Sequence, residues 1–173
     1  KSGLAGLDFV ASAGLANVIM EPLRGGSLIQ NIPDEVHALW DGADKKRNPV
    51  EWAYEYLWDK PMVHSVFSGM SNLEQVKENV AIAERTDVNS MSQHDRDILQ
   101  KVCEVYKQRE EIPCTGCRYC MPCHNEVNIP HCFKQYNIAK SLNYVDKVSA
   151  PYFWLVREEE RADNCTMCDE CTI

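Results

Sequence analysis

The sequence predicts an α/β fold over residues 1–110, followed by a smaller, mostly helical domain over residues 111–173. Two observations lead to this division. Helix-like and strand-like apolar patterns alternate in the first region, which is typical of parallel strands connected by helices. In the second region, seven of the nine cysteines fall into two closely spaced runs, which is typical of a metal-binding framework.

Composition narrows the class of protein. The 173 residues carry a formal net charge of −8, which argues against nucleic-acid binding, because phosphate binding needs a basic surface. No apolar stretch is long enough to span a membrane, and the first residues lack the apolar core of a secretory signal. The odd number of cysteines argues against a disulfide framework. We therefore expect a cytoplasmic protein that binds neither nucleic acid nor membrane, with Lys45, Lys46 and Arg47 in a solvated loop.

The first predicted unit is a helix followed by a strand. Apolar residues recur at helical spacing over residues 4–13, and Gly14 stands where a left-handed C-terminal cap would end the helix. The short apolar run 17–20 fits a strand buried on both faces. It leads into the loop 21–26, whose glycines allow close approach to the backbone, although an ordinary turn is the alternative.

The second unit repeats this order. Asn48, Pro49 and Glu51 provide an N-cap, a first-turn proline and an acidic third position for a helix that stops before Pro61. The apolar run 62–67 predicts a second buried strand.

A glycine turn and a third helix follow the second strand. Ser71 and Glu74 match a capping box at the start of this helix. The residues expected to face the core are Leu73, Val76, Val80 and Ala83. A strand, a glycine turn and a helix N-terminus suit an anion, because free backbone N–H groups point at the loop, although most such turns bind nothing.

Two cysteines lie in predicted helices outside the runs. A helix over about 95–108, capped at Ser92, carries Cys103, and a helix over 131–140 carries Cys132. Helical spacing places both thiols on inner faces, so we expect two buried, small apolar residues rather than metal ligands.

The two cysteine runs point to metal chemistry. They read Cys114-Thr-Gly-Cys117-Arg-Tyr-Cys120-Met-Pro-Cys123 and Cys165-Thr-Met-Cys168-Asp-Glu-Cys171. Two-residue gaps let a turning backbone aim thiolates at one centre, and paired runs of this kind hold two [4Fe-4S] clusters in ferredoxins. A predicted helix over 151–161 returns the chain so that the runs can meet. Zinc is the alternative, although it usually takes its thiolates from two pairs of cysteines.

The ferredoxin pattern draws three ligands of each cluster from one run and the fourth from the other. One cluster would take Cys114, Cys117 and Cys120. The second would take Cys165, Cys168 and Cys171, with Cys123 crossing over. The first cluster then lacks a ligand, so we expect the domain to be truncated at its C-terminus, after Ile173.

Two strands do not make a stable parallel sheet. They would leave apolar edges and faces in water unless something covers them. We expect either further strands encoded before residue 1 or a homo-oligomer that buries these faces.

Four segments carry a resemblance to a known family. They are Val18-Ile-Met-Glu-Pro-Leu-Arg-Gly-Gly26, Pro49-Val-Glu-Trp-Ala53, Ser68-Gly-Met-Ser-Asn-Leu-Glu-Gln-Val-Lys-Glu-Asn79 and the first cysteine run. In these segments the chain resembles aldo/keto reductases that carry a C-terminal ferredoxin-like iron–sulfur domain. The resemblance implies the C-terminal portion of a (β/α)8 barrel over residues 1–110 and a domain with two [4Fe-4S] clusters over residues 111–173. It also implies NADP or NAD bound at the C-terminal ends of the barrel strands.

The resemblance further implies which residues contact the dinucleotide. The loop after the first strand would lie against the pyrophosphate, and the turn after the second strand would hold the adenosine phosphate side. The following helix would face the ribose and adenine. The residues concerned are Glu21, Pro22, Leu23, Gly25, Gly69, Met70, Ser71, Asn72, Gln75, Glu78 and Asn79. NADP-selective members of the family place basic residues where Gly69 and Gln75 stand, so the choice between NADPH and NADH stays open.

The implied activity is nicotinamide-dependent reduction or oxidation of a small carbonyl or alcohol substrate, with clusters that pass electrons to a redox partner protein. The family's catalytic Asp, Tyr, Lys and His have no match here, so we expect an active parent enzyme but an inactive chain as written. The first run closes one residue shorter than the common ferredoxin run, which leaves the crossover of Cys123 open. A second hypothesis is a non-catalytic electron-transfer or zinc-stabilised module.

Overall fold

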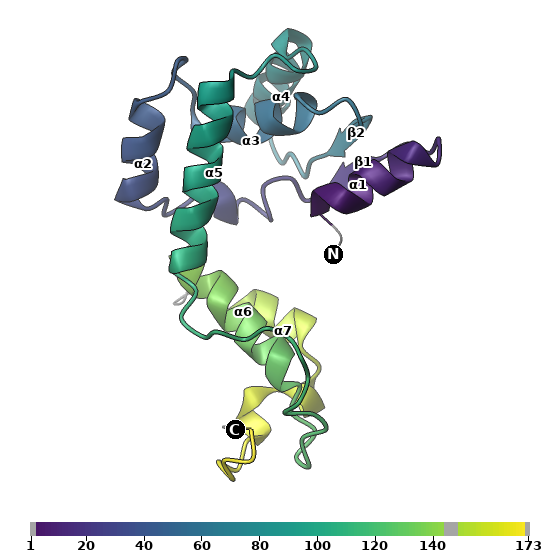
Figure 1. Cartoon of the computed structure of the whole chain (residues 1–173), viewed down its shortest axis with the longest axis vertical. Coiled ribbons are helices and arrows are strands. Elements are labelled where there is room, and N and C mark those ends of the chain that lie inside the picture. The colour runs from purple at the N-terminus through teal and green to yellow at the C-terminus, as the bar shows by residue number, and fades with distance from the viewer. Residues whose placement is uncertain (1–2, 144–148, 172–173) are drawn as a thin grey trace. The chain divides into compact units, whose positions relative to one another are not determined.

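The computed structural model describes residues 3–143 and 149–171. The chain divides into two compact units, Lys1–Lys101 and Val102–Ile173, each described here by itself. Figure 1 shows helices together with one small parallel sheet, so the chain has the α/β character that the sequence predicts. The division falls inside helix α5 (Gln93–Gln108) rather than at residue 110.

The first predicted unit is present as α1 (Gly3–Ser12) and β1 (Val18–Met20). Gly14 adopts a φ of +71°, and the Leu15 N–H donates to the Val10 carbonyl oxygen at 3.2 Å. A hydrogen bond from the N–H of residue i+5 to the carbonyl oxygen of residue i is typical of a helix that ends in the left-handed conformation, so the glycine cap is confirmed. However, α1 buries no residue, and Phe9 is 74% exposed.

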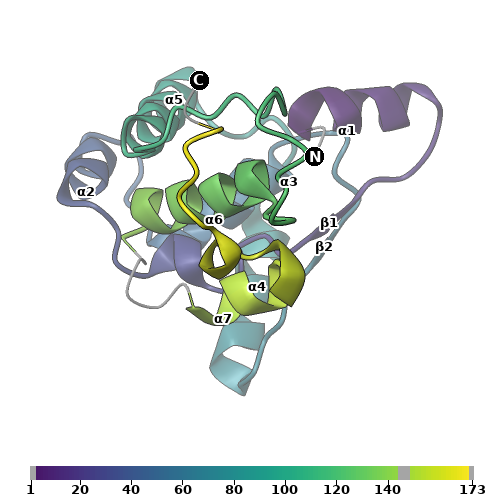
Figure 2. The same ribbon diagram turned by 90° about the horizontal axis from the view of Figure 1, so that it is seen from below.

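The two strands pair in parallel, as expected. β2 (Ser65–Phe67) lies beside β1, with Val18 opposite Ser65 and Met20 opposite Phe67 (Figure 2). The prediction that both strands are buried is wrong, since Met20 is 72% exposed and Phe67 is 59% exposed. The physical reason is the size of the sheet: in the part of the chain that the structure describes, these two strands have no neighbours whose crossover helices would cover their faces.

Two elements between β1 and residue 48 were not predicted. They are the 3-10 turn η1 (Ser27–Ile29) and the helix α2 (Asp34–Asp41). Val36 of α2 is completely buried, so this short helix contributes to the core of the first unit.

Helix α3 (Pro49–Trp58) starts as the sequence predicts. The Glu51 N–H donates to Asn48 Oδ1 at 2.9 Å, and the Asn48 N–H donates to Glu51 Oε2 at 2.7 Å. These reciprocal bonds satisfy two N–H groups that the helix itself cannot, which confirms the capping box. The helix buries Trp52 and Tyr54 and packs on α4 (Leu73–Arg85).

Helix α4 (Leu73–Arg85) departs from expectation in its cap and in its buried face. Its N-cap is Asn72, whose Oδ1 accepts the Gln75 N–H at 2.9 Å, so the predicted capping box of Ser71 and Glu74 is wrong. The four residues predicted to face the core are all exposed; they are Leu73, Val76, Val80 and Ala83. Ile82 is completely buried instead, because the contact with α3 selects the face that also carries Asn79.

A buried ionic network, here called the Arg47 network, ties the loop before α3 to α3 and α5. Arg47 Nε lies 2.6 Å from Glu55 Oε2, and Arg47 Nη1 lies 2.8 Å from Asp95 Oδ2. The side chains of all three residues are less than a tenth exposed, so the predicted solvated loop is wrong at Arg47. Burial alone would lower the pKa of Arg47, but the hydrogen bonds to Glu55 and Asp95 raise it above its ordinary value. The guanidinium also lies 4.5 Å from the ring centroid of Trp52.

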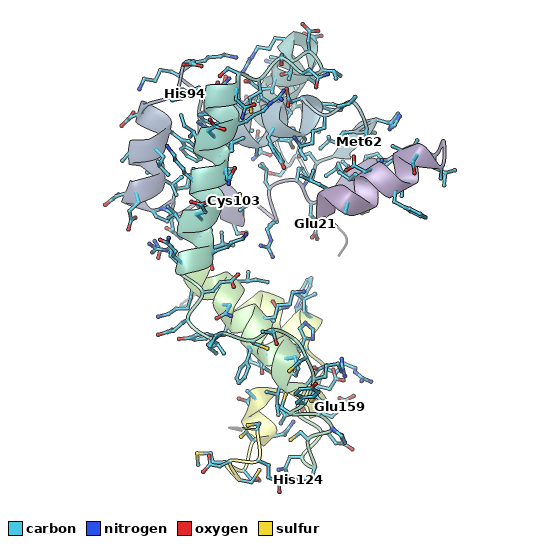
Figure 3. All side chains as sticks on the ribbon, in the orientation of Figure 1. Glu21, Met62, His94, Cys103, His124 and Glu159 are labelled. Carbon is cyan, nitrogen blue, oxygen red and sulfur yellow. The ribbon has the colours of Figure 1, made fainter. Side chains whose placement is uncertain are left out.

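Helix α5 confirms one prediction and contradicts another. The Asp95 N–H donates to Ser92 Oγ at 3.1 Å, which confirms the predicted cap. Cys103 is exposed on the side of α5 (Figure 3), so its predicted burial is wrong. The buried positions are Asp95, Ile98 and Val102, which repeat at intervals of three and four; the residue after Val102 is turned away from that face.

The second unit has a small core under the cysteine runs. It consists of Val127, Ile129, Cys132 and Val156, contributed by α6 (Ile129–Ser141) and by the segments before α6 and after α7 (Ser149–Leu155). Burial of Cys132 is confirmed, and this burial raises the pKa of its thiol. The predicted helix over 151–161 is interrupted, because α7 ends at Leu155 and 3-10 turns follow at Glu158–Glu160 and Ala162–Asn164.

Candidate functional site

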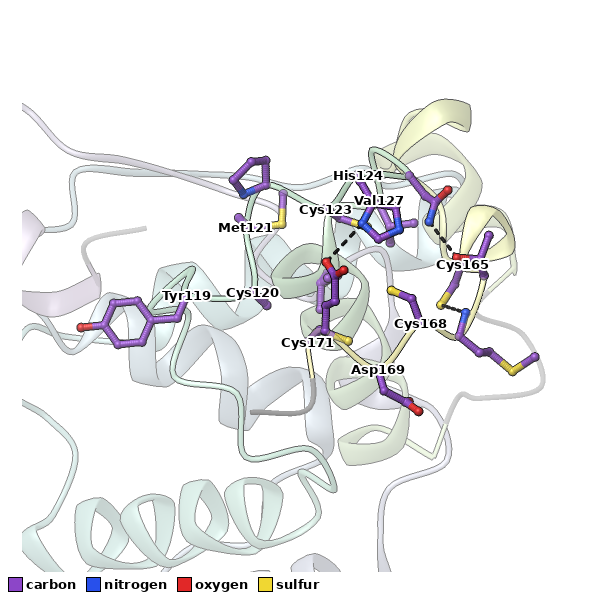
Figure 4. A pocket seen from close by; sticks show the side chains of 16 residues that line it. Tyr119, Cys120, Met121, Cys123, His124, Val127, Cys165, Cys168, Asp169 and Cys171 are labelled. Atoms are coloured by element: carbon purple, nitrogen blue, oxygen red, sulfur yellow. Dashed lines mark hydrogen bonds and ion pairs between the residues drawn. The ribbon is translucent and has the colours of Figure 1, made fainter.

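The two cysteine runs meet at one cavity in the second unit (Figure 4). The cavity has a volume of about 270 Å³. Five of the seven run cysteines line it, namely Cys120, Cys123, Cys165, Cys168 and Cys171. All four thiols assigned from the sequence to the second cluster are therefore in this set. Cys114 and Cys117 do not line the cavity.

Left-handed residues position the thiols. Four of the five two-residue gaps between successive run cysteines contain a residue with positive φ, namely Gly116, Arg118, Met167 and Asp169. Each such residue turns the backbone sharply, which lets cysteines three positions apart point towards the same side. The Met167 N–H also donates to Cys165 Sγ at 3.4 Å.

Further contacts involve the residues in and beside the two runs. Asn125 Nδ2 donates to Thr166 Oγ1 at 2.9 Å and so connects the segment after the first run to the second run (Figure 4). The pKa of Cys117 lies below its ordinary value, because the Tyr119 backbone N–H and then the Thr115 hydroxyl donate to its sulfur. A lowered pKa favours the thiolate, which is the form that binds metal.

The arrangement of donor atoms can be tested against the two metals considered. A tetrahedral zinc site with Zn–S bonds of about 2.3 Å would bring its sulfurs to about 3.8 Å from one another. Over the described ranges, no three cysteine sulfurs approach within 4.8 Å of one another. A [4Fe-4S] cluster instead attaches each thiolate to a different iron, so its ligands surround a wider space. Cys123, Cys165, Cys168 and Cys171 all line the one cavity.

A mixed trio beside the cavity was not predicted. One ligand atom from each of His124, Cys168 and Glu170 lies within 4.8 Å of the other two. His124 Nδ1 is 3.2 Å from Glu170 Oε2 (Figure 4). The only sequence signal was adjacency, because His124 follows one run cysteine and Glu170 precedes another.

A second hollow lies in the first unit, at the C-terminal ends of β1 and β2. Its volume is about 670 Å³, within the range of about 300–1,000 Å³ that is usual for ligand sites. It is lined by ten of the eleven residues that the resemblance assigns to a dinucleotide; they are Glu21, Pro22, Leu23, Gly25, Gly69, Met70, Ser71, Gln75, Glu78 and Asn79. Glu21 directly follows β1 (Figure 3), and Asn72, the eleventh residue, caps α4 beside the hollow.

Polar groups around this hollow are held by short-range hydrogen bonds. Gln75 Oε1 accepts the Ser71 N–H at 2.8 Å, and Asn79 Nδ2 donates to Ser68 Oγ at 3.3 Å. Some of the N–H groups expected for an anion are therefore occupied by side chains. The backbone N–H groups of Leu73 and Glu74, in the first turn of α4, have no hydrogen-bond partner within the helix.

Within residues 3–143 and 149–171, no helix has both the length and the apolar character needed to cross a membrane. Comparison of the chain with protein-family models, with curated proteins and with solved structures found no match.

Proposed function

We propose that this chain is part of an oxidoreductase that holds iron–sulfur clusters through its cysteine runs and binds a nicotinamide dinucleotide in the first unit. The observation that carries the proposal is the cavity lined by five run cysteines from two segments far apart in the chain. Iron–sulfur clusters of the ferredoxin type are held by thiolates drawn from two such runs. The resemblance to aldo/keto reductases with a C-terminal iron–sulfur domain supports the same assignment.

The residues of the second run would hold one [4Fe-4S] cluster together with Cys123. When bound, such a cluster supplies one-electron transfer. The chain itself contributes the N–H donor of Met167 to Cys165 and the carboxylates of Asp169 and Glu170 next to the ligands. Negative charge beside a cluster favours a low reduction potential.

The hollow at the ends of β1 and β2 would bind the dinucleotide, and a small carbonyl or alcohol would be the substrate of the parent enzyme. A hydride carries two electrons, whereas each cluster passes one at a time, so the clusters would serve a redox partner protein. The chain offers no match for the family's proton-donating tetrad. We therefore expect no carbonyl reductase activity from it alone.

A second candidate function is a zinc-stabilised module without electron transfer. The observation that favours it is the trio of His124, Cys168 and Glu170, because imidazole, thiolate and carboxylate are all zinc ligands.

Anaerobic reconstitution with iron and sulfide separates the two candidates. We expect a brown protein with about one stable cluster, since only the second cluster has four cysteine ligands here. Cys168→Ser should remove most of the iron and sulfide, whereas the controls Cys103→Ser and Cys132→Ser should retain them. Metal and sulfide analysis, absorbance and electron paramagnetic resonance report the result.

One further variant is needed, because Cys168 belongs to both candidate sites. His124→Ala should leave iron and sulfide in place if the thiolates hold a cluster. Purification with zinc and without sulfide, and loss of that zinc in His124→Ala, would contradict electron transfer and support the second candidate.

A further inference from the structure

We infer that the hollow at the ends of β1 and β2 selects NADH over NADPH. This inference rests on the proposed dinucleotide site and adds its cofactor preference. The two cofactors differ only in the 2′-phosphate of NADPH, which adds a charge of about −1.5 to −2 near neutral pH. The charge of the side chains that line the hollow therefore decides between them.

The charged side chains of the hollow are both acidic. They are Glu21, directly after β1, and Glu78, on α4. In the described lining there is no lysine, arginine or histidine. A 2′-phosphate is normally held by a cation, most effectively by arginine, so its specific recognition group is missing from this lining.

The carboxylate of Glu78 is held in place rather than free to swing away. Asn48 Nδ2 donates to Glu78 Oε1 at 2.8 Å. Asn48 is itself fixed by its reciprocal hydrogen bonds with Glu51 at the start of α3. A 2′-phosphate entering the hollow would therefore meet a fixed negative charge.

The same carboxylates suit NADH. A carboxylate accepts hydrogen bonds from ribose hydroxyls, and NADH keeps both its 2′- and 3′-hydroxyls free on the adenosine ribose. The pyrophosphate is common to both cofactors, so any repulsion between it and Glu21 cancels in the comparison. What remains is the repulsion of the 2′-phosphate, which at partly solvated separations amounts to roughly a tenfold difference in affinity.

The test compares the affinities of NADH and NADPH for the full chain by saturation-transfer NMR at low ionic strength. We expect NADH to bind roughly tenfold more tightly, with the difference shrinking as salt is added. Glu78→Lys should reduce or reverse the ratio of the two affinities. The matched control is Glu84→Lys, which makes the same charge change on α4 at an exposed position outside the hollow and far from the first turn of the helix, and should leave the ratio almost unchanged.

Glu21→Lys provides a second test, which keeps the inference falsifiable if loss of the Asn48–Glu78 bond unfolds the first variant. It too should shift the ratio towards NADPH. NADPH binding as tightly as NADH to the unaltered chain would overturn the inference and leave the dinucleotide site standing. An equal shift in Glu84→Lys and Glu78→Lys would also overturn it, since the effect would then be one of net charge. Binding of neither cofactor would overturn the proposed dinucleotide site as well.

Discussion

The two units of the chain reach their stability in different ways. The first buries large aromatic side chains and the charged Arg47 network, yet it leaves the apolar residues of its strands in water. Among its described residues, the second buries the cluster of Val127, Ile129, Cys132 and Val156 together with smaller sites such as Ala139, and its cysteine runs lie mostly on the surface around a cavity. Buried ionic and aromatic contacts therefore hold the first unit, whereas on the proposed function a cluster bound by the thiols would stabilise the second.

The first unit exposes apolar side chains on both strands and on α4. Met20 and Phe67 on paired strands and Val80 on α4 are all about half exposed or more. Exposed apolar strands in a soluble protein are usually covered by further strands or by another subunit.

Replacing Arg47 with methionine should destabilise the first unit most. The substitution keeps much of the side-chain volume but leaves the carboxylates of Glu55 and Asp95 buried without their shared cation. Removing one partner of a buried ion pair typically costs about 3–5 kcal/mol. The free energy of unfolding can be measured in urea by tryptophan fluorescence in a Trp154→Phe background, because the other three tryptophans belong to the first unit.

Lys46→Met is the matched control for this prediction. Lys46 pairs with Asp41 at 3.1 Å, but their side chains are 74% and 80% exposed. Exposed pairs contribute about 0–1 kcal/mol, so this variant should unfold almost like the unaltered chain. Equal losses in the two variants would mean that water screens the Arg47 network and that the first unit is held by packing alone.

Local sequence patterns predicted the ends of elements better than their buried faces. The caps at Gly14, Asn48 and Ser92 depend on residues within a few positions, so the sequence contains all the information they need. The face that α4 buries depends on α3, a partner distant in sequence. Periodicity found the larger apolar stripe through Val80, but packing buried Ile82 instead.

At the candidate sites, too, local sequence patterns did not predict contacts between segments distant in the chain. Spacing alone indicated that the two cysteine runs would meet, because a cluster needs ligands from both. Spacing could not place His124 against Glu170, since that contact depends on how two loops lie side by side. Arg47 was assigned to a solvated loop because its two basic neighbours suggested one; its carboxylate partners come from α3 and α5.

A milder loss of stability should separate the buried and exposed faces of α4. Ile82→Ala should cost about 2–5 kcal/mol, because it opens a cavity at a completely buried position. Val80→Ala, two residues away at a position that is about half exposed, should change the free energy of unfolding by about 0.5 kcal/mol or less. The free energies of unfolding of both variants can be measured in urea by tryptophan fluorescence, as for Arg47→Met. A larger loss for Val80→Ala would mean that the sequence-based stripe is buried in solution, for instance in an oligomer.

The smallest predicted effect is the loss of stability of the first unit at acidic pH, which the second unit should not share. Burial alone would raise the pKa of Glu55, but hydrogen bonds from Arg47 and then Lys45 outweigh it and hold that pKa below the ordinary value of 4.5. A carboxyl whose pKa is lower in the folded state stabilises the fold fully above its unfolded-state pKa, and this stabilisation is lost as the pH falls through the folded-state value. The first unit should therefore lose stability as the pH falls below about 4.5. Glu55→Gln should be less stable near neutral pH but should show a flatter response to acid in that window.

Glu111 of the second unit is the control for this prediction. It also has a lowered pKa, through Tyr136 and Lys140, but its carboxyl is exposed, so water screens those contacts. Glu111→Gln should therefore leave the acid response nearly unchanged. Unfolding free energies measured at a series of pH values decide the matter: an unchanged slope in Glu55→Gln would remove this carboxyl from the acid sensitivity of the first unit.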